Sequence, residues 1–309
     1  MNDFLISIII PVFNEENNIR PLLDRLLPIL NNIRYEIIFI DDGSKDKTVD
    51  IIRTESTKNN KIKFVRFNRN FGHQMALVAG YRFAQGDCVL SMDSDLQDPP
   101  EIVPNMITKW QSGAKIVYAR RKKRDVDGFF KRKTALLFYA FMNFLSDKNI
   151  PDNVGDFRLI DRLVVEYLNK LPEHSPFLRG LVSWSGYKED FVDFDRQKRH
   201  SGQTHYSIPK MLNFALDGIT SFSTKPLRVA SYMGFVTASF GFFGIIYAII
   251  GKFLLPIPWV TGWTGIFVGV MFIGGVQLIS IGIIGEYISK IYTEVLRRPH
   301  YIVAEKINL

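Results

Sequence analysis

Cysteine is nearly absent from this sequence, and the common nucleotide-binding loops are missing. Cys88 is the only cysteine among the 309 residues, which excludes a disulfide within the chain and a cysteine-rich metal site. No Gly-x-Gly-x-x-Gly motif and no Walker-type lysine loop occur, so hydride transfer and P-loop chemistry lose support. Cys88 itself lies in the apolar segment GDCVL and is predicted to be a small core residue of a strand.

The N-terminus also lacks the features of a targeting signal. Its apolar run is only about seven residues long and ends at Pro11, whereas a membrane span needs about 20 residues. Neither a positively charged start nor a small-residue cleavage site accompanies this run. We therefore expect a first β-strand here and not a signal peptide.

The first half of the chain alternates short apolar runs with amphipathic stretches. This alternation predicts an α/β fold with a mostly parallel sheet, because strands that are apolar throughout are covered by helices on both faces. The expected strands are LISIII, EIIFID, IKFVRF, DCVLSMD and AKIVYA, and the expected helices cover residues 16–30, 48–58, 73–84 and 102–110.

Three polar clusters, PVFNEE, DDGSKD and DSDLQD, each follow one of these strands. Ligands of parallel sheets bind where the carboxyl ends of the strands meet, so the shared position predicts a site. Asp93, Asp95 and Gln97 are spaced so that an extended backbone would direct all three to one side. Their oxygen atoms predict a Mg²⁺ or Mn²⁺ site completed by a diphosphate. An acidic turn is the simpler alternative, but the position after a buried strand favours the site.

For other carboxylates, helix capping explains the sequence about as well as ligand binding does. Asp42, next to Asp41, could accept hydrogen bonds from a base or a ribose, while Ser44 or Asp46 could cap the following helix. Asp156 precedes an amphipathic segment, and a helix N-cap explains it equally well. Four histidines lack the spacing of a metal-ligand set and are assigned no catalytic role: His73, His174, His200 and His205.

The C-terminal third contains two long runs without charge, residues 229–251 and 253–285. Each run is long enough to cross the roughly 30 Å hydrocarbon layer, which favours a transmembrane hairpin over two buried helices of a soluble domain. We expect transmembrane helices at about 229–251 and 264–286 within residues 229–289. Lysine and arginine flank the hairpin on both sides, which predicts that both ends and the large N-terminal domain are cytoplasmic.

The formal net charge of +8 fits an anionic partner such as a phosphate-bearing ligand, nucleic acid or a membrane surface. Eight of the residues in 120–133 are basic, and an apolar stretch follows. We therefore expect a membrane-surface segment over 120–146, with a solvated basic loop as the alternative. The remaining predicted parts are a cytoplasmic catalytic domain over 1–205, a juxtamembrane amphipathic segment over 206–228 and a cytoplasmic tail over 290–309.

Read in order, the motifs resemble those of family 2 glycosyltransferases of the polyprenyl-phosphate type. This group includes dolichyl-phosphate mannosyltransferases and bactoprenol glucosyltransferases. The resemblance covers essentially the whole chain, and the two-span C-terminus is similar to the bactoprenol branch. It implies an A-type glycosyltransferase fold, which is Rossmann-like. The motifs that carry it are PVFNEE, DDGSKDKT, NFGHQMALVAGYRFAQGD, MDSDLQDPPE, VGDFRLIDR and RHSGQTHYS.

The resemblance also implies roles for individual residues. Asp156 stands where many mannosyl-transferring relatives carry glycine, which favours the glucosyl branch and makes Asp156, with Asp95, a candidate catalytic residue. Residues 203–205 depart from the usual Glu-Ser-Lys, so no role is carried onto them. The other implied roles are nucleotide-sugar binding by Pro11, Glu15, Asp42 and Asp93, metal binding by Asp93, Asp95 and Gln97, and phosphate binding by Arg120, Arg132 and Arg199.

The expected reaction is an inverting, metal-dependent transfer of a hexose to a polyprenyl phosphate such as undecaprenyl phosphate, on the cytoplasmic face of the cytoplasmic membrane. UDP-glucose is the favoured donor, and UDP-linked N-acetylhexosamines and GDP-mannose are the alternatives. A non-enzymatic membrane scaffold would leave the polar clusters unexplained. A processive polysaccharide synthase would usually need more spans and a Gln-x-x-Arg-Trp element, which is absent. A homo-oligomer is expected, and nucleic acid is not expected as a partner.

Overall fold

The computed structural model divides into two compact units, which we call the sheet unit and the helical unit. The sheet unit contains residues 1–133, 149–211 and 298–309, and the helical unit contains residues 134–148 and 212–297. Arg132, Arg199 and most of the basic segment lie outside the described residues. The described residues are 4–122, 154–173, 176–195, 224–253 and 262–309.

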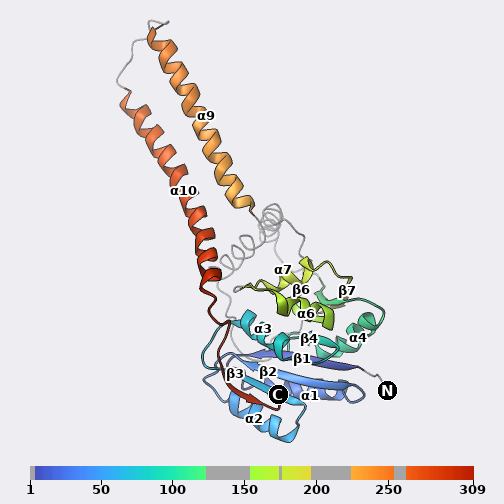
Figure 1. Ribbon diagram of the computed structural model, residues 1–309. Coiled ribbons are helices and arrows are strands. Elements are labelled where there is room, and N and C mark those ends of the chain that lie inside the picture. The colour runs from blue at the N-terminus through green and yellow to red at the C-terminus, as the bar shows by residue number, and fades with distance from the viewer. Residues whose placement is uncertain (1–3, 123–153, 174–175, 196–223, 254–261) are drawn as a thin grey trace. The chain divides into compact units, whose positions relative to one another are not determined.

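A mixed sheet of eight strands forms the described part of the sheet unit, in the order β7-β5-β6-β4-β1-β2-β3-β8 (Figure 1). β2, β1 and β4 are parallel neighbours, as are β2 and β3 and also β5 and β7. β6 is antiparallel to both β4 and β5, and β8 is antiparallel to β3. The strands are β1 (Leu5–Val12), β2 (Arg34–Asp41), β3 (Ile62–Phe67), β4 (Cys88–Ser91), β5 (Ile116–Arg121), β6 (Val154–Asp161), β7 (Glu189–Phe194) and β8 (Val303–Ile307).

The helices of this unit follow the predicted periodicity closely. The helix expected over 48–58 has those bounds, and the one expected over 16–30 begins three residues later because residues 15–18 form a turn. The helices are α1 (Ile19–Ile29), α2 (Thr48–Lys58), α3 (His73–Phe83), η1 (Pro100–Ile102), α4 (Val103–Gln111), α6 (Arg162–Lys170) and α7 (Leu178–Trp184).

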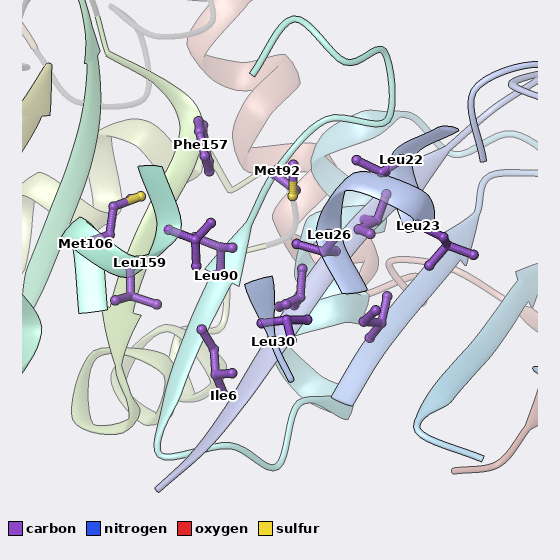
Figure 2. Packing of buried hydrophobic residues seen from close by; sticks show 14 of the residues in the cluster. Ile6, Leu22, Leu23, Leu26, Leu30, Leu90, Met92, Met106, Phe157 and Leu159 are labelled. Atoms are coloured by element: carbon purple, nitrogen blue, oxygen red, sulfur yellow. The ribbon is translucent and has the colours of Figure 1, made fainter. Parts of the chain in front are cut away.

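Alternate residues of the central strands face opposite helical layers, as the pleat of a strand requires. Ile6 and Ile8 are fully buried in a core that they share with residues of α1, α2 and α4. Ile9 is equally buried but faces α3 on the other side of the sheet, where Gly80 lies against it. Cys88 belongs to the first core, as predicted. Figure 2 labels part of this core: Ile6, Leu22, Leu23, Leu26, Leu30, Leu90, Met92, Met106, Phe157 and Leu159.

The strand β6 was not predicted, because its sequence VGDFRLID contains three charged residues. All three, Asp156, Arg158 and Asp161, are nevertheless buried. The N-cap alternative for Asp156 is wrong, because Asp156 lies within β6. The cap of α6 is Asp161, whose carboxylate accepts a hydrogen bond of 3.1 Å from the Leu163 N–H. An antiparallel strand thus stands where the sequence predicted a helix start.

The strand β8 lies where the sequence predicted only a tail. It pairs with β3, and the Arg53 guanidinium holds the Glu305 carboxylate with two contacts of 3.0 and 2.6 Å. Its five residues alternate between half-buried and exposed, so they lack the continuous apolar run that marks a central strand. The strand covers the hydrogen-bonding edge of β3, which would otherwise be open to another chain.

The helical unit contains α9 (Lys225–Phe253) and α10 (Trp263–Leu296), which pack against each other. The predicted ranges 229–251 and 264–286 both fall inside these helices. Residues 269–296 of α10 are long and apolar enough to cross a membrane, by length and composition. Both helices expose large apolar side chains: Phe235 is 74% exposed and Leu278 is 73% exposed. Exposed apolar surface of this extent is typical of a contact with lipid or protein.

The close approach of α3 to β1 gives a testable prediction. A Cβ atom at Gly80 would lie 2.1 Å from Ile9 Cγ2, so we expect Gly80→Ala to lower the free energy of unfolding by about 1–3 kcal/mol. Urea unfolding in detergent measures this change. In an Ile9→Ala background, which removes Cγ2, the same substitution should cost much less. Equal costs in the two backgrounds would contradict the contact.

Candidate functional site

The polar clusters meet at one edge of the sheet, where the carboxyl ends of β1, β2 and β4 lie side by side. The antiparallel strand β6 begins at this edge, because Ser91 at the end of β4 pairs with Arg158. Asp93 lies two residues after Ser91, and Asp156 lies two residues before Arg158. The register therefore brings two carboxylates together that are 63 positions apart in the sequence.

The loops after β1 and β2 are joined by reciprocal hydrogen bonds. The Asn14 N–H donates to Ser44 Oγ over 2.9 Å, and the Lys45 N–H donates to Asn14 Oδ1 over 2.9 Å. The Glu15 N–H donates to Thr48 Oγ1 over 2.8 Å. Asn14 has a φ of 56°, a left-handed conformation that asparagine tolerates better than most residues. The loops PVFNEE and DDGSKD thus form one wall of the site.

Asp42 connects this wall to the loop between β3 and α3. Its carboxylate accepts hydrogen bonds from the Phe71 N–H at 2.6 Å and from the Gly72 N–H at 2.9 Å. Burial raises the pKa of Asp42 above its ordinary value despite these two bonds. Asp46 accepts a hydrogen bond of 3.0 Å from the Thr48 N–H, but the N-cap residue of α2 is Lys47, so neither Ser44 nor Asp46 is the cap. The two aspartates of this loop thus bind different backbone N–H groups, Asp42 those of Phe71 and Gly72 and Asp46 that of Thr48.

Asp93, Asp95 and Gln97 do not lie on an extended backbone. The prediction that an extended backbone directs all three side chains to one side is therefore wrong. β4 ends at Ser91, and the chain then turns with Leu96 at a φ of 60°. Asp95 is buried and accepts a 3.0 Å hydrogen bond from the Gln97 N–H, which closes the turn. The Asp93 side chain remains 42% exposed. Asp93 is therefore the carboxylate of this cluster that is most open to a ligand.

Asp156 is the centre of a buried charge network. Its side chain is only 4% exposed, and Arg179 contacts both of its oxygens, with Nε at 3.2 Å and Nη2 at 2.8 Å. Arg158 contributes Nη2 at 3.4 Å, and His73 contributes Nε2 at 3.4 Å. Burial alone would raise the pKa of Asp156, but the bond to His73 and the two guanidinium charges hold it well below its ordinary value. Asp156 is therefore an anion at neutral pH and a weak base.

His73 links the two carboxylates across the site. Its Nε2 atom lies 3.7 Å from Asp93 Oδ1 in addition to its contact with Asp156. Burial opposes protonation of His73, but the hydrogen bond to Asp156 and the charge of Asp93 raise its pKa above the ordinary value. Neither His73 nor Arg179 was predicted from the sequence to be a site residue. A single histidine after a glycine and a single arginine in an apolar helix carry no spacing signal.

The other expected site residues lie further from this network. Arg120 forms an exposed ion pair with Asp193, with Nε 2.6 Å from Oδ1. Its neighbour Arg121 lies on the opposite face of β5, with Nη2 3.9 Å from the buried Asp98 carboxylate. Pro11 is buried in β1 beyond the pairing with β4, where its missing N–H costs no ladder bond. The phosphate-binding role of Arg120 stays a prediction.

The side chains of this site can hold a divalent cation only if a bound ligand supplies the remaining oxygen atoms. Within the described residues, no group of three or more His, Cys, Asp or Glu side chains is placed to enclose a metal ion. The half-exposed Asp93 carboxylate is a hard oxygen ligand at the sheet edge, and Mg²⁺ or Mn²⁺ is usually held by one or two carboxylates together with substrate phosphates. Asp93 fits a metal that is shared with a diphosphate.

The motif order, the sheet topology and the carboxylates at the sheet edge agree with a comparison to known families. Residues 7–168 match the family described as Glycosyl transferase family 2. The chain belongs to glycosyl transferase family 2. The resemblance noted in the sequence is confirmed, and this member of the family is a glycosyltransferase.

Relatives of similar length extend this match to nearly the whole chain. The SfII prophage-derived bactoprenol glucosyl transferase of Shigella flexneri is 45% identical over 301 residues, which cover 96% of this chain and 97% of that protein. A prophage bactoprenol glucosyl transferase homolog of Escherichia coli is 44% identical, with 96% and 98% covered. An uncharacterized glycosyltransferase of Synechocystis is also 44% identical, with 97% and 95% covered.

Solved structures with low sequence identity share the fold. Glucosyl-3-phosphoglycerate synthase from Mycobacterium tuberculosis, in complex with phosphoglyceric acid, has a TM-score of 0.52 at 19% identity. The match covers 71% of this chain and 78% of that one. The same enzyme in complex with Mn²⁺, UDP-glucose and glycerol 3-phosphate has a TM-score of 0.50. The expected A-type glycosyltransferase fold is confirmed.

The charge network predicts a pH-dependent loss of stability in Asp156→Asn. At neutral pH the variant leaves two buried or partly buried arginines without their anion, which should cost about 3–5 kcal/mol. Because the folded pKa of Asp156 is lowered, its contribution is complete above about pH 4 and is lost as the pH falls towards that pKa. Urea unfolding across pH 3–7 should therefore show the two proteins converging at low pH. Asp193→Asn, which breaks only an exposed pair, should change little at any pH.

Proposed function

We propose that this glycosyltransferase transfers glucose from UDP-glucose to a polyprenyl phosphate at the cytoplasmic face of the membrane, with inversion at the anomeric carbon. The observation that carries the proposal is the 45% identity, along nearly the whole chain, to a protein named bactoprenol glucosyl transferase. The charge network at the sheet edge suits such a reaction, because it combines anionic and cationic groups within one small region.

The proposed acceptor does not require a strong base in the site. A phosphate monoester has a second pKa near 6, so it is already largely a dianion and a nucleophile at neutral pH. What it needs is a fixed position close to the anomeric carbon. Arg179, which is 30% exposed, presents its positive charge to the site from beside Asp156, and His73, which is 37% exposed, adds a second positive charge when its ring is protonated, a form that its raised pKa favours. In this proposal the two cations hold a phosphate in line for attack.

Asp156 has a positioning role in this mechanism. Its lowered pKa makes it a poor proton acceptor, but it fixes the Arg179 guanidinium through two contacts and holds the His73 ring. A bidentate carboxylate–guanidinium pair restricts both planes, so the arginine presents its remaining N–H groups in a set direction. The sequence predicted a catalytic role for Asp156. In this proposal its role is to orient Arg179 and His73, which touch the phosphate.

The donor is proposed to bind between the β1–β2 wall and the turn after β4. Glu15, Asp42 and the Pro11 segment would hold the nucleoside, and Asp93, with Asp95 and Gln97 shaping its turn, would hold the diphosphate and the metal. A bound Mg²⁺ or Mn²⁺ would stabilise the negative charge that develops on the departing nucleotide. The mycobacterial synthase of the same fold, crystallised with Mn²⁺ and UDP-glucose, supports this choice of donor and ion class.

A membrane location is proposed from the helical unit and the acceptor. The long apolar stretch in α10 can anchor the chain, and the basic residues that flank the hairpin predict a cytoplasmic catalytic domain. A polyprenyl chain keeps its phosphate at the bilayer surface, where an anchored enzyme can reach it. We further propose that several copies associate through the helices, because small residues in α9 and α10 allow close helix packing.

The donor and acceptor are tested together by transfer of radiolabelled sugar into an organic-extractable lipid. The purified full-length protein with undecaprenyl phosphate and Mn²⁺ should label the lipid from UDP-glucose, at least tenfold faster than from GDP-mannose. Retention of the α configuration in the product, determined by NMR, would contradict the inverting step. Preferential use of GDP-mannose would replace the donor assignment, and no transfer from any nucleotide sugar would reject the function.

The metal assignment is tested by UDP binding with and without Mn²⁺. We expect Asp93→Asn to weaken Mn²⁺-dependent binding at least about tenfold, because the amide replaces the anionic ligand. Binding in the absence of metal should change far less. Asp24→Asn, on the exposed face of α1, is the matched control and should bind like the parent protein. Normal Mn²⁺-dependent binding by Asp93→Asn would remove Asp93 from the metal site.

A further inference from the structure

The last residues of the chain are part of the sheet unit and are fixed to it from several sides. Beyond the pairing of β8 with β3, Asn308 Nδ2 donates to the Ser56 carbonyl at 2.8 Å and to the Ile62 carbonyl at 3.0 Å. The Lys306 ammonium lies over the ring of Phe83, 4.8 Å from its centroid. These contacts place residues 298–309 against β3, α2 and α3, although the helical unit precedes them in the sequence.

The start of this segment contacts the loop between β3 and α3, residues 68–72, which we call the donor loop. The Asn68 N–H donates to the Ile302 carbonyl over 3.1 Å. The Tyr301 ring stacks on Phe67 at the end of β3, with centroids 4.8 Å apart and an interplanar angle of 14°. Phe67 in turn meets Phe71 of the loop edge to face, at 5.8 Å and 88°. An unbroken series of rings thus joins the C-terminal segment to the loop.

The opposite side of the donor loop faces the nucleotide wall. Asp42 accepts the hydrogen bonds of Phe71 and Gly72 described above. Gly43, at a φ of 79°, lies so close that a Cβ atom there would be 2.7 Å from the Arg69 carbonyl carbon. The loop is therefore held between the β2 end and the C-terminal segment. His73 follows directly, so the position of the loop also sets the start of α3.

We propose that Tyr301 is a positioning residue for donor binding, and that the C-terminal segment holds the donor loop in its binding conformation. The inference rests on the proposed function in so far as the donor binds beside Asp42. It goes further, because it assigns a role in donor affinity to a segment that touches no substrate. Aromatic pairs contribute enough for loss of one ring to change an equilibrium about two- to tenfold.

The test compares Tyr301→Ala, Tyr301→Phe and Lys306→Ala in the full chain. Without any ligand, Tyr301→Ala should speed hydrogen exchange at the Phe71 and Gly72 amides about two- to tenfold, because the loop loses the stacked ring. The same variant should raise the Kd for UDP with Mn²⁺ and the KM for the donor by a similar factor, with kcat and the acceptor KM little changed. Tyr301→Phe keeps the ring, so its exchange rate, its Kd for UDP and its KM for the donor should be close to those of the parent protein.

Lys306→Ala is the matched control, because its side chain contacts Phe83 and not the donor loop, while the pairing of β8 with β3 and the two bonds of Asn308 still fix the segment. It should leave exchange in the loop and UDP affinity unchanged. If Tyr301→Ala does not fold, Tyr301→Leu, which keeps apolar bulk without a planar ring, replaces it. Unchanged loop exchange or unchanged UDP affinity in the ring-deleted variant would overturn the inference. Failure of the parent protein to bind any nucleotide would instead reject the proposed function, while the ligand-free exchange would still decide whether Tyr301 orders the loop.

Discussion

The site depends on a carboxylate that is buried with two arginines and a histidine as its partners. A charge as enclosed as Asp156 is stable only when it is paired and hydrogen-bonded, and Arg158, Arg179 and His73 meet that condition together. The partners come from β6, α7 and the start of α3, so one carboxylate fixes three elements relative to one another. Arg158 is fully buried and also reaches the Tyr81 hydroxyl at 3.3 Å, which extends the network into the layer behind the sheet. Cations brought together in this way suit a reaction between two phosphate-bearing molecules.

The loops around this network are ordered mostly by side chain to backbone hydrogen bonds. Loops are the least regular parts of a sheet protein, yet here the side chains of Asn14, Asp42 and Asp95 each accept a hydrogen bond from a backbone N–H of a loop. Such bonds satisfy backbone groups that the sheet cannot pair and limit the motion of the loop. A binding surface that is ordered before the ligand arrives loses less entropy on binding.

The sequence was sufficient for elements whose periodicity reflects their burial. β1 to β4 and α2 were predicted because apolar strands and amphipathic helices follow from which faces are covered. β6 was missed because its charges are neutralised by residues far away in the sequence, which no local pattern reveals. The same reason hid Arg179 and His73, since only the register between β4 and β6 brings them to Asp156. The prediction for Asp93, Asp95 and Gln97 assumed an extended backbone, whereas the chain turns at Leu96. The order of these residue types in the sequence indicates a metal or diphosphate site, but the local backbone conformation decides in which direction each side chain points.

The edge strand β8 has a consequence for the order in which the protein is made. The sheet that carries the active site is complete only when residues 303–307 have left the ribosome, after both long apolar helices have been synthesised. Until then β3 presents an unpaired edge. The growing chain must therefore keep an unfinished catalytic sheet from pairing with neighbours while its helices find their final environment. Pairing of β8 with β3 therefore follows synthesis of the helices, and a chain that lacks residues 303–307 would leave the hydrogen-bonding edge of β3 open.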